Sequence, residues 1–465
     1  MAAEEETPSS SSPSPGSGVR RRLVAVAAVV ALIAGSGVGL DHALGPRAAG
    51  AGEASGAATG GWFCPHGGSP GWSGWVVMAN PGTATVRVRL TELTGEKPPS
   101  VTSLSIGPLR QVYREVSAAD PADATVVEFF GGWIGAAAVI LSDQSPQAVA
   151  AERCEPSSRR TWYLLDEPTG PGDTSFVVVM NPFAEDAAFD LAARTETRTI
   201  APGSLRPYVL PARSSVAFRL NDIALEGPGE QTVAVTVVQR VGRVVAGGVA
   251  LSAGGLRVEG GATLSRITDI PAGGYAGTAE LILANPGTTR ADLSVIGSGR
   301  TGQRLVSGPD GISLAAGEVR TIDLKGLTLG AVVQSDNRQP ISAVLRVAGP
   351  RGDEATVTGT PTAARAWLVL PALTPKGGRS LLVLQNPGRS GLQLAVQLLG
   401  QTGVVPAPRL SAISLPPGRT ISVTIPAFAS RPLTVVVRAQ GGTVVVGTAS
   451  YPAGGGYAAM LALPM

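Results

Sequence analysis

Apolar and polar positions recur along the chain with a period of about a hundred residues. Four apolar runs each end at an Asn-Pro dipeptide, and the dipeptides lie 101, 104 and 101 residues apart. They are Asn80-Pro81, Asn181-Pro182, Asn285-Pro286 and Asn386-Pro387. Proline cannot donate to a strand ladder and holds the residue before it in an extended conformation, so each dipeptide should end a strand. The spacing therefore predicts four copies of one structural repeat.

The residues after each dipeptide predict a turn and then a second strand. Three dipeptides continue with glycine, at Gly82, Gly287 and Gly388. Asn-Pro-Gly is typical of a type II turn, in which glycine supplies a positive φ at the third position. The second copy has Phe183 there, which predicts another turn type. Residues 86–90 then alternate valine or leucine with arginine, the pattern of a strand with one buried face.

A further short apolar element recurs before each repeat and once after the last. The five copies are Trp62-Phe63-Cys64, Trp162–Leu165, Ile267–Ile270, Trp367–Leu370 and Met460–Leu463. Six or seven strands fit into each repeat, which predicts an all-β fold of tandem immunoglobulin-like β-sandwich repeats. The predicted repeats cover residues 61–160, 161–264, 265–365 and 366–465. We favour a linear array over a β-propeller with two blades per repeat, in which the extra strand would complete the first or last blade.

The N-terminal residues predict a membrane segment. Residues 1–22 are polar and are expected to form a disordered cytoplasmic tail. Its last three residues are arginines, and an uncharged run of 18 residues follows at 23–40, near the lower limit for spanning a bilayer. We interpret this run as a transmembrane signal-anchor, with a flexible Ala/Gly linker at 41–60 and an extracellular body. A cleaved signal peptide and a secreted body are the alternative.

Composition agrees with a chain of short strands and turns. Charged residues make up 15% and aromatic residues 4%, whereas there are 61 glycines and 37 prolines. A net charge of +3 is too small to indicate a nucleic-acid partner.

The two cysteines, Cys64 and Cys154, both follow the hydrophobic run. In an exported body they are expected to form a disulfide, and closing a loop of about 90 residues would stabilise the fold by roughly 4 to 5 kcal/mol. Two reduced structural thiols are the alternative. Only His42 and His66 could supplement them as zinc ligands, so we predict no metal site.

No residue pattern predicts catalysis. His42 lies in the linker, and we interpret His66 as part of an exposed loop within the turn-rich residues 65–70. Adjacent carboxylates on a strand point to opposite faces, so we interpret three acidic pairs as solvated loop charge. They are Asp166-Glu167, Glu185-Asp186 and Asp353-Glu354. No nucleotide-binding or zinc-protease motif is present either, and we expect no cofactor and no enzymatic activity.

Tryptophan is concentrated in the first repeat. Four of the six tryptophans are there: Trp62, Trp72, Trp75 and Trp133. Trp72 and Trp75 could form a platform for a sugar or a partner protein, because exposed aromatic rings offer a large contact area at low entropic cost. Core packing around the disulfide would explain them as simply.

The arginine-flanked anchor, the Ala/Gly linker, the segment Trp62-Phe63-Cys64-Pro65 and the four Asn-Pro repeats resemble an uncharacterised family of membrane-anchored or secreted envelope proteins of actinobacteria. That family has only a domain-of-unknown-function label, so the resemblance implies a place in the cell envelope and no reaction. Our leading hypothesis is a non-catalytic cell-envelope scaffold or binding protein that displays its repeats outside the membrane. The alternative is a glycan-binding accessory subunit of an envelope glycosyltransferase or other cell-wall enzyme. The expected partners are the membrane and either a cell-wall glycan or another envelope protein.

Overall fold

The computed structural model describes residues 59–142, 148–227, 230, 232–274, 278–299, 301–307, 311–349, 351–372, 378–425, 432–452 and 455–465. The predicted tail, the predicted anchor at 23–40 and the linker up to residue 58 lie outside these residues. Within the described ranges, no helix is both long and apolar enough to cross a bilayer.

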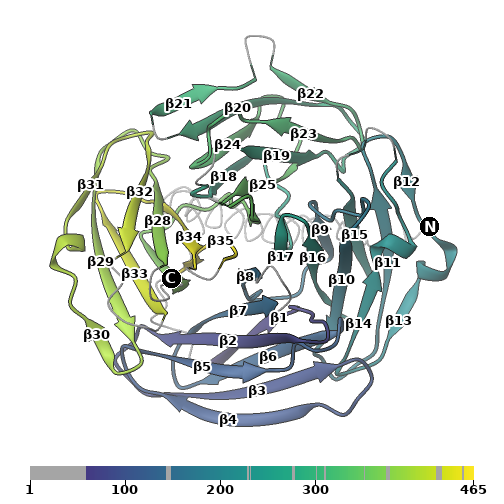
Figure 1. The fold of residues 1–465 in the computed structure, drawn as a ribbon, viewed down its shortest axis with the longest axis horizontal. Coiled ribbons are helices and arrows are strands. Elements are labelled where there is room, and N and C mark those ends of the chain that lie inside the picture. Colours follow the sequence, from purple (N-terminus) through teal and green to yellow (C-terminus); the bar gives the residue numbers. More distant parts are fainter. Residues whose placement is uncertain are drawn as a thin grey trace, which may run out of the picture. The chain divides into compact units, whose positions relative to one another are not determined.

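The described residues form strands and three single-turn 3-10 helices (Figure 1). The first repeat contains β1 (Thr59–Cys64), β2 (Trp72–Asn80), β3 (Val86–Thr94), β4 (Ser100–Ile106), β5 (Arg110–Val116), β6 (Asp123–Phe130), β7 (Gly135–Ser142) and β8 (Ala148–Arg153). The second contains β9 (Thr161–Leu164), β10 (Thr174–Asn181), β11 (Ala187–Arg194), β12 (Thr199–Ile200), η1 (Gly203–Leu205), β13 (Tyr208–Leu210), β14 (Ser214–Arg219), η2 (Leu220–Asp222), β15 (Ala234–Val241), β16 (Val245–Ser252) and β17 (Gly255–Gly260).

The third repeat contains β18 (Ile267–Pro271), β19 (Ala279–Ala284), β20 (Ala291–Gly299), β21 (Gly302–Leu305), β22 (Ile312–Leu314), β23 (Val319–Asp323), β24 (Gly330–Ser335), β25 (Ser342–Ala348) and β26 (Glu354–Thr358). The fourth contains β27 (Ala366–Ala372), β28 (Arg379–Gln385), β29 (Leu392–Gly400), β30 (Gly403–Val405), η3 (Pro408–Leu410), β31 (Ile413–Leu415), β32 (Thr420–Ile425), β33 (Leu433–Gln440), β34 (Val445–Tyr451), β35 (Ala458–Leu461) and β36 (Leu463–Pro464).

Each repeat builds two antiparallel sheets with the same strand order. In the first repeat the sheets are β1-β6-β3-β4 and β5-β2-β7-β8. The same two orders recur as β9-β15-β11-β12 with β14-β10-β16-β17, as β18-β24-β20-β21 with β23-β19-β25-β26, and as β27-β33-β29-β30 with β32-β28-β34-β35. The two sheets of a repeat share one apolar core. The all-β fold is therefore confirmed, and the paired antiparallel sheets are consistent with β-sandwich packing.

The fifth copy of the short apolar element belongs to the fourth repeat. The first four copies form β1, β9, β18 and β27, each at an edge of its own repeat's first sheet or next to it. The last copy ends in β36, which pairs with β27 at Trp367 and Leu368. It therefore extends a sheet of the last repeat rather than beginning a fifth.

The linear array that the sequence favoured is wrong, because the first and fourth repeats contact each other. Strand β27 packs against β2 and β7, and β8 packs against β35. Apolar residues of the fourth repeat, such as Leu368, Val436 and Leu463, enter the core of the first. Repeats one and two, two and three, and three and four also pack together. The sheets thus stack face to face in a closed cycle, two per repeat, as in the propeller alternative.

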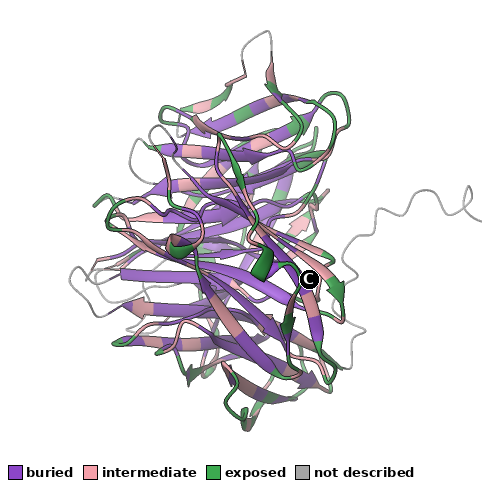
Figure 2. Cartoon of the chain, turned by 90° about the vertical axis from the view of Figure 1, so that its right-hand side faces the viewer, coloured by how far each residue is buried: buried purple, intermediate pink, exposed green. Residues whose placement is uncertain are grey.

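Four strands lie where the repeats meet. Strands β8, β17, β26 and β35 each contact the next in the cycle. Figure 1 shows β8, β17 and β35 near the centre, surrounded by the other strands. We call this set of four the axial strands. Burial follows the same plan: buried positions run along the strands, and exposed positions gather in the connections (Figure 2).

Candidate functional site

The four Asn-Pro dipeptides lie at the ends of β2, β10, β19 and β28, and their asparagine side chains are buried. The Asn80 Nδ2 donates to the carbonyls of Ala84, Ile106 and Gly107 at 2.7, 3.1 and 3.1 Å. Its Oδ1 accepts from the backbone N–H of Gly82 at 2.9 Å. Asn181, Asn285 and Asn386 make the equivalent four contacts. Each asparagine therefore joins the turn that follows its own strand to the turn that precedes the next strand of the same sheet.

The predicted type II turn is wrong. Gly82, Gly287 and Gly388 do not have a positive φ, which that turn requires at its third position. The asparagine side chain instead takes the place of a backbone carbonyl and accepts the hydrogen bond, as in an Asx turn. Because this turn leaves the third residue in an ordinary conformation, Phe183 fits where the other repeats have glycine.

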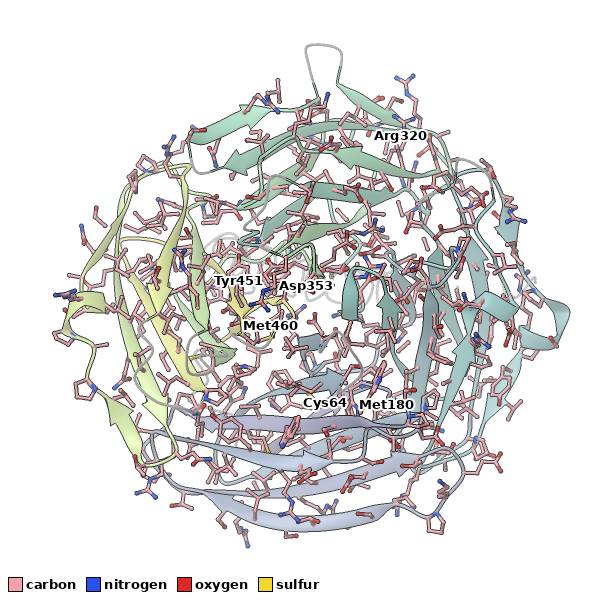
Figure 3. All side chains as sticks on the ribbon, in the orientation of Figure 1. Cys64, Met180, Arg320, Asp353, Tyr451 and Met460 are labelled. Atoms are coloured by element: carbon pink, nitrogen blue, oxygen red, sulfur yellow. A yellow bond between two sulfur atoms is a disulfide. The ribbon has the colours of Figure 1, made fainter. Side chains whose placement is uncertain are left out.

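The predicted disulfide between Cys64 and Cys154 is confirmed, so the reduced-thiol alternative is wrong. The two Cα atoms are 4.5 Å apart, and the bridge joins the end of β1 to the residue after β8. Reciprocal backbone hydrogen bonds of 2.9 and 2.8 Å between Phe63 and Glu155 lie beside it. Cys64 is labelled in Figure 3. The bridge links the two sheets of the first repeat.

The two tryptophans of the predicted platform lie in different surroundings. Trp72 is only 8% exposed and packs with Ile140, Val178 and Val249 between the first and second repeats. It therefore belongs to the core. Trp75 is half-buried and lines an open cavity, so of the pair only Trp75 remains as a candidate ligand contact.

The cavity beside Trp75 has a volume of about 320 Å³ and an apolar lining. Its walls are Trp75, Val77, Tyr113, Val139, Leu141, Gln401 and Pro432. The first five come from β2, β5 and β7, and the last two from the fourth repeat. The Tyr113 hydroxyl and the Gln111 carboxamide both donate to the Pro432 carbonyl, which fixes the contact between the two repeats. We call this cavity the Trp75 pocket.

His66 is buried rather than exposed, which corrects the sequence interpretation. It is 1% exposed, with Nδ1 2.9 Å from the Gly67 carbonyl and Nε2 3.0 Å from the Thr125 hydroxyl. Burial lowers the pKa of His66, although the Gly67 carbonyl and the carboxylates of Asp123 and Glu92 oppose that shift. Both ring nitrogens therefore take part in hydrogen bonds within the first repeat.

Three carboxylates lie near His66 around a very small cavity. Glu152, Glu155 and Glu259 line a space of only about 10 Å³, together with His66 itself. A cavity of that size has room for about one water molecule and not for a substrate. Among the described residues, the Oε2 of Glu152 and the Oε1 of Glu155 are buried without a hydrogen-bond partner. Burial raises the pKa of both Glu152 and Glu259 to about 8.

Asp166 and Glu167 are also buried, so our interpretation of this pair as solvated loop charge is wrong. Asp166 pairs with Arg257 at 3.3 Å and with Arg346 of the third repeat. Burial alone would raise its pKa, but the two guanidinium groups outweigh that effect and hold the pKa well below its usual range. Glu167 packs so closely on Gly248 that a Cβ there would lie 1.5 Å from its Oε1. Burial raises the pKa of Glu167 far above its ordinary value.

Together these groups form an ionic cluster around the axial strands, which sequence reasoning missed. Its members Glu152, Arg257, Glu259 and Glu354 lie on β8, β17 and β26, and Asp166 follows β9. Arg257 bridges Asp166 and Glu354, at 3.3 and 3.0 Å. The available signal was the pair of charges inside the short glycine-bounded run at 255–260, where a strand buried on both faces should be apolar. Among the described residues, no group of three or more acidic, histidine or cysteine side chains could hold a metal ion.

The fold defines a class: a cyclic all-β protein of four two-sheet repeats, closed by contacts between its first and last repeats and clamped by one disulfide. A family model described as "Family of unknown function (DUF5719)" matches residues 128–366 and 351–459. The chain therefore belongs to this family. No curated protein in the comparison is similar to the chain.

One solved structure similar to part of the chain is described as "Crystal Structure of Thermotoga maritima 1070". It is 16% identical, and the match covers 21% of this chain and 92% of that one, with a TM-score of 0.19.

Proposed function

We propose that this protein is a non-catalytic binding protein of the cell envelope, anchored in the membrane by residues 23–40 and displaying its repeat cycle on the outer side. The disulfide supports export, because such bonds persist in oxidising compartments. The tripled arginine before the uncharged run supports the orientation.

The observation that carries the binding role is the Trp75 pocket. An apolar cavity with an indole and a phenol on its walls can take a large side chain from a partner protein, and such buried anchors supply most of the binding energy of an interface. The surrounding β-strands hold these walls in place, so little order would have to be gained on binding.

Crosslinking in cells tests this proposal. A photoreactive residue in place of Gln401, at the rim of the pocket, should capture an envelope protein when the full chain is expressed in its native membrane. Trp75→Ala should reduce the crosslinked yield about tenfold, as expected for a central aromatic anchor. The matched control is Phe176→Ala, because Phe176 is half-buried at the same place in the second repeat and should leave the yield unchanged. An equal yield from both variants would contradict a role for the Trp75 pocket.

A second candidate function is the recognition of a cell-wall glycan as an accessory subunit of an envelope enzyme. A second open cavity of this molecule, walled by an indole and an arginine, favours it. Binding of the full chain to an array of envelope glycans is the expected result, and a uniform absence of binding would exclude this candidate.

A further inference from the structure

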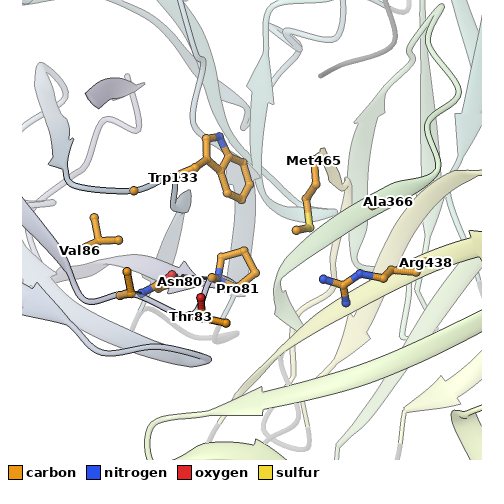
Figure 4. A pocket seen from close by; sticks show the side chains of 11 residues that line it. Asn80, Pro81, Thr83, Val86, Trp133, Ala366, Arg438 and Met465 are labelled. Carbon is orange, nitrogen blue, oxygen red and sulfur yellow. Dashed lines mark hydrogen bonds between the residues drawn. The ribbon is translucent and has the colours of Figure 1, made fainter. Parts of the chain in front are cut away.

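A cavity of about 390 Å³ opens between the first and fourth repeats, separate from the Trp75 pocket. The first repeat contributes the turn from Asn80 to Ala84, Val86, Gly132 and Trp133, and the fourth contributes Ala366, Arg438 and Met465. Figure 4 shows the indole of Trp133, the ring of Pro81, the thioether of Met465 and the guanidinium of Arg438 around the same space. We call it the Trp133 pocket.

The indole of Trp133 is held in position from behind. It meets Trp62 edge to face, with ring centroids 6.0 Å apart and an interplanar angle of 76°. Trp62 is buried, and its Nε1 donates to the Ile134 carbonyl at 2.7 Å. Trp133 is therefore a half-buried, preorganised surface that loses little freedom when a ligand stacks on it.

Arg438 is the charged group of the Trp133 pocket. It is exposed on β33, opposite Ala366 in the pairing with β27, and its guanidinium forms no hydrogen bond or ion pair with the described residues. Among the residues that the structure describes, no aspartate or glutamate lines the cavity. The turn has two polar side chains: Asn80 already uses both its oxygen and its nitrogen within the repeat, and Thr83 adds an uncharged hydroxyl. The lining therefore combines an aromatic face with one guanidinium that forms no ion pair among the described residues.

The equivalent space differs in the other repeats. The residue two before β7, β16, β25 and β34 is Trp133, Arg243, Pro340 and Thr443, respectively. In the second repeat, Arg243 lies over the ring of Phe183, 3.7 Å from its centroid, and Phe183 occupies the turn position that is Gly82 in the first repeat. Of the described side chains, a Cβ on Gly82 would contact that of Asn80 alone, at 3.1 Å, so the corresponding space in the first repeat is open.

We propose that the Trp133 pocket binds an acidic saccharide, a pyranose ring that carries a carboxylate. The apolar face of the sugar ring stacks on the indole, as aromatic platforms allow, and the planar guanidinium of Arg438 pairs with the carboxylate in bidentate fashion. The volume fits one or two sugar units, within the range of small-molecule sites. The proposal rests on the glycan-binding candidate above and names the ligand class and the site.

Ligand-observed NMR titration of the purified full chain tests the proposal, with methyl β-glucuronide as the probe and methyl β-glucoside as its uncharged counterpart. The glucuronide should bind about tenfold more tightly than the glucoside, as one charge-assisted pair implies. Arg438→Gln should remove that preference. Trp133→Ala should weaken binding of both sugars about tenfold or more.

A filling variant keeps the test independent of these two side chains. Gly82→Phe copies the residue that the second repeat has at this turn, so it should fold normally, occupy the pocket and abolish binding of both sugars. Trp75→Ala should leave sugar binding unchanged. If glucuronide binding survives Trp133→Ala but is lost with Trp75→Ala, the glycan-binding candidate stands and this site assignment is overturned. If neither sugar binds, the proposal and that candidate fail together, while the crosslinking test still decides the binding role of the Trp75 pocket.

A peptide probe tests whether the Trp133 pocket recognises the carboxylate of a sugar or the carboxylate at the end of a peptide. The dipeptide acetyl-alanyl-alanine, which carries a carboxylate and no sugar ring, should bind at least tenfold more weakly than the glucuronide. Equal binding of both probes would overturn the assignment to a saccharide.

Discussion

At the scale of single residues, one backbone position has a positive φ in all four repeats but is occupied by different residues. Leu109, Arg213, Gly317 and Gly418 have φ values of 52°, 53°, 69° and 64°, directly before the strand segment that returns beside the Asn-Pro asparagine. Glycine adopts this left-handed conformation freely, whereas a residue with a Cβ is strained by about 1 to 2 kcal/mol. The first two repeats therefore carry a cost that the last two avoid.

Arg213→Gly should consequently stabilise the protein. Arg213 is exposed, so the substitution relieves backbone strain without opening a core. We expect the free energy of unfolding to rise by about 0.5 to 1 kcal/mol after allowing for the greater freedom of glycine in the unfolded chain. Urea unfolding of the full chain measures this. Arg213→Ala, which removes the side chain but retains the Cβ, is the control and should gain nothing; equal stability of the two variants would contradict the strain argument.

At the scale of the element, the Asn-Pro turn is a clamp built from one side chain. Its carboxamide holds the turn that follows one strand and the turn that precedes another, and all four copies make the same contacts. Such a buried carboxamide stabilises the fold mainly because its removal would be costly. The backbone carbonyls that now accept its hydrogen bonds would remain buried without a donor.

Asn285→Ala should therefore destabilise the protein by about 2 to 4 kcal/mol, as expected when several buried carbonyls lose their donors. Asn285→Asp should be no milder, because a carboxylate would face the three carbonyls that now accept from the Asn285 Nδ2. The exposed Asn337 lies in the same repeat and is the control, since Asn337→Ala should cost less than about 1 kcal/mol. Thermal unfolding of the three variants compares them; similar midpoints for Asn285→Ala and Asn337→Ala would exclude the clamp.

The strands themselves could be predicted from the sequence, but their two-sided burial was overlooked. Residues 86–90 alternate as a strand with one solvated face does, and β3 has that burial pattern. By contrast, residues 76–79 of β2 are all buried, as a continuous apolar run requires. A free-standing sandwich needs no strand covered on both faces. These runs were therefore a signal that each sheet packs on two neighbours, as the closed cycle shows.

At the scale of the whole repeat cycle, closure brings together groups that sequence spacing keeps apart. Glu152 and Glu259 come from different repeats, and Arg346 reaches Asp166 from 180 residues away. The sequence could predict the disulfide and single out Trp75, because the chain has only two cysteines and four of its six tryptophans lie in the first repeat. It could not assemble the ionic cluster or the Trp133 pocket, because each depends on which repeats are neighbours across the cycle, and local pattern says nothing about that.

The ionic cluster makes the stability of the cycle depend on pH. Burial raises the pKa of Glu152 and of Glu259 from about 4.5 to about 8, so both are protonated in the folded protein at neutral pH and ionised in the unfolded chain. Each of these two carboxyls therefore contributes its full share of the free energy of unfolding below pH 4.5. That contribution is lost as the pH rises from there through about 8. Asp166 acts in the opposite sense, because its pKa is depressed, but only below its ordinary value of 3.8.

We therefore expect the urea midpoint of the full chain to fall from pH 6.5 to pH 8.5, with up to about 1.4 kcal/mol lost per pH unit for each raised carboxyl below its folded-state pKa. The lowered pKa of His66 would stabilise the fold as the pH rises, but mainly below its ordinary value of 6.5, so this window largely avoids it. Glu152→Gln keeps the shape of a protonated carboxyl and cannot ionise. It should flatten the decline by the share of one group, whereas Glu115→Gln, a change on the exposed face of β5, should not. A midpoint independent of pH in the unmodified chain would show that these carboxyls are not held protonated at the axial strands, because burial could not then be penalising their charge.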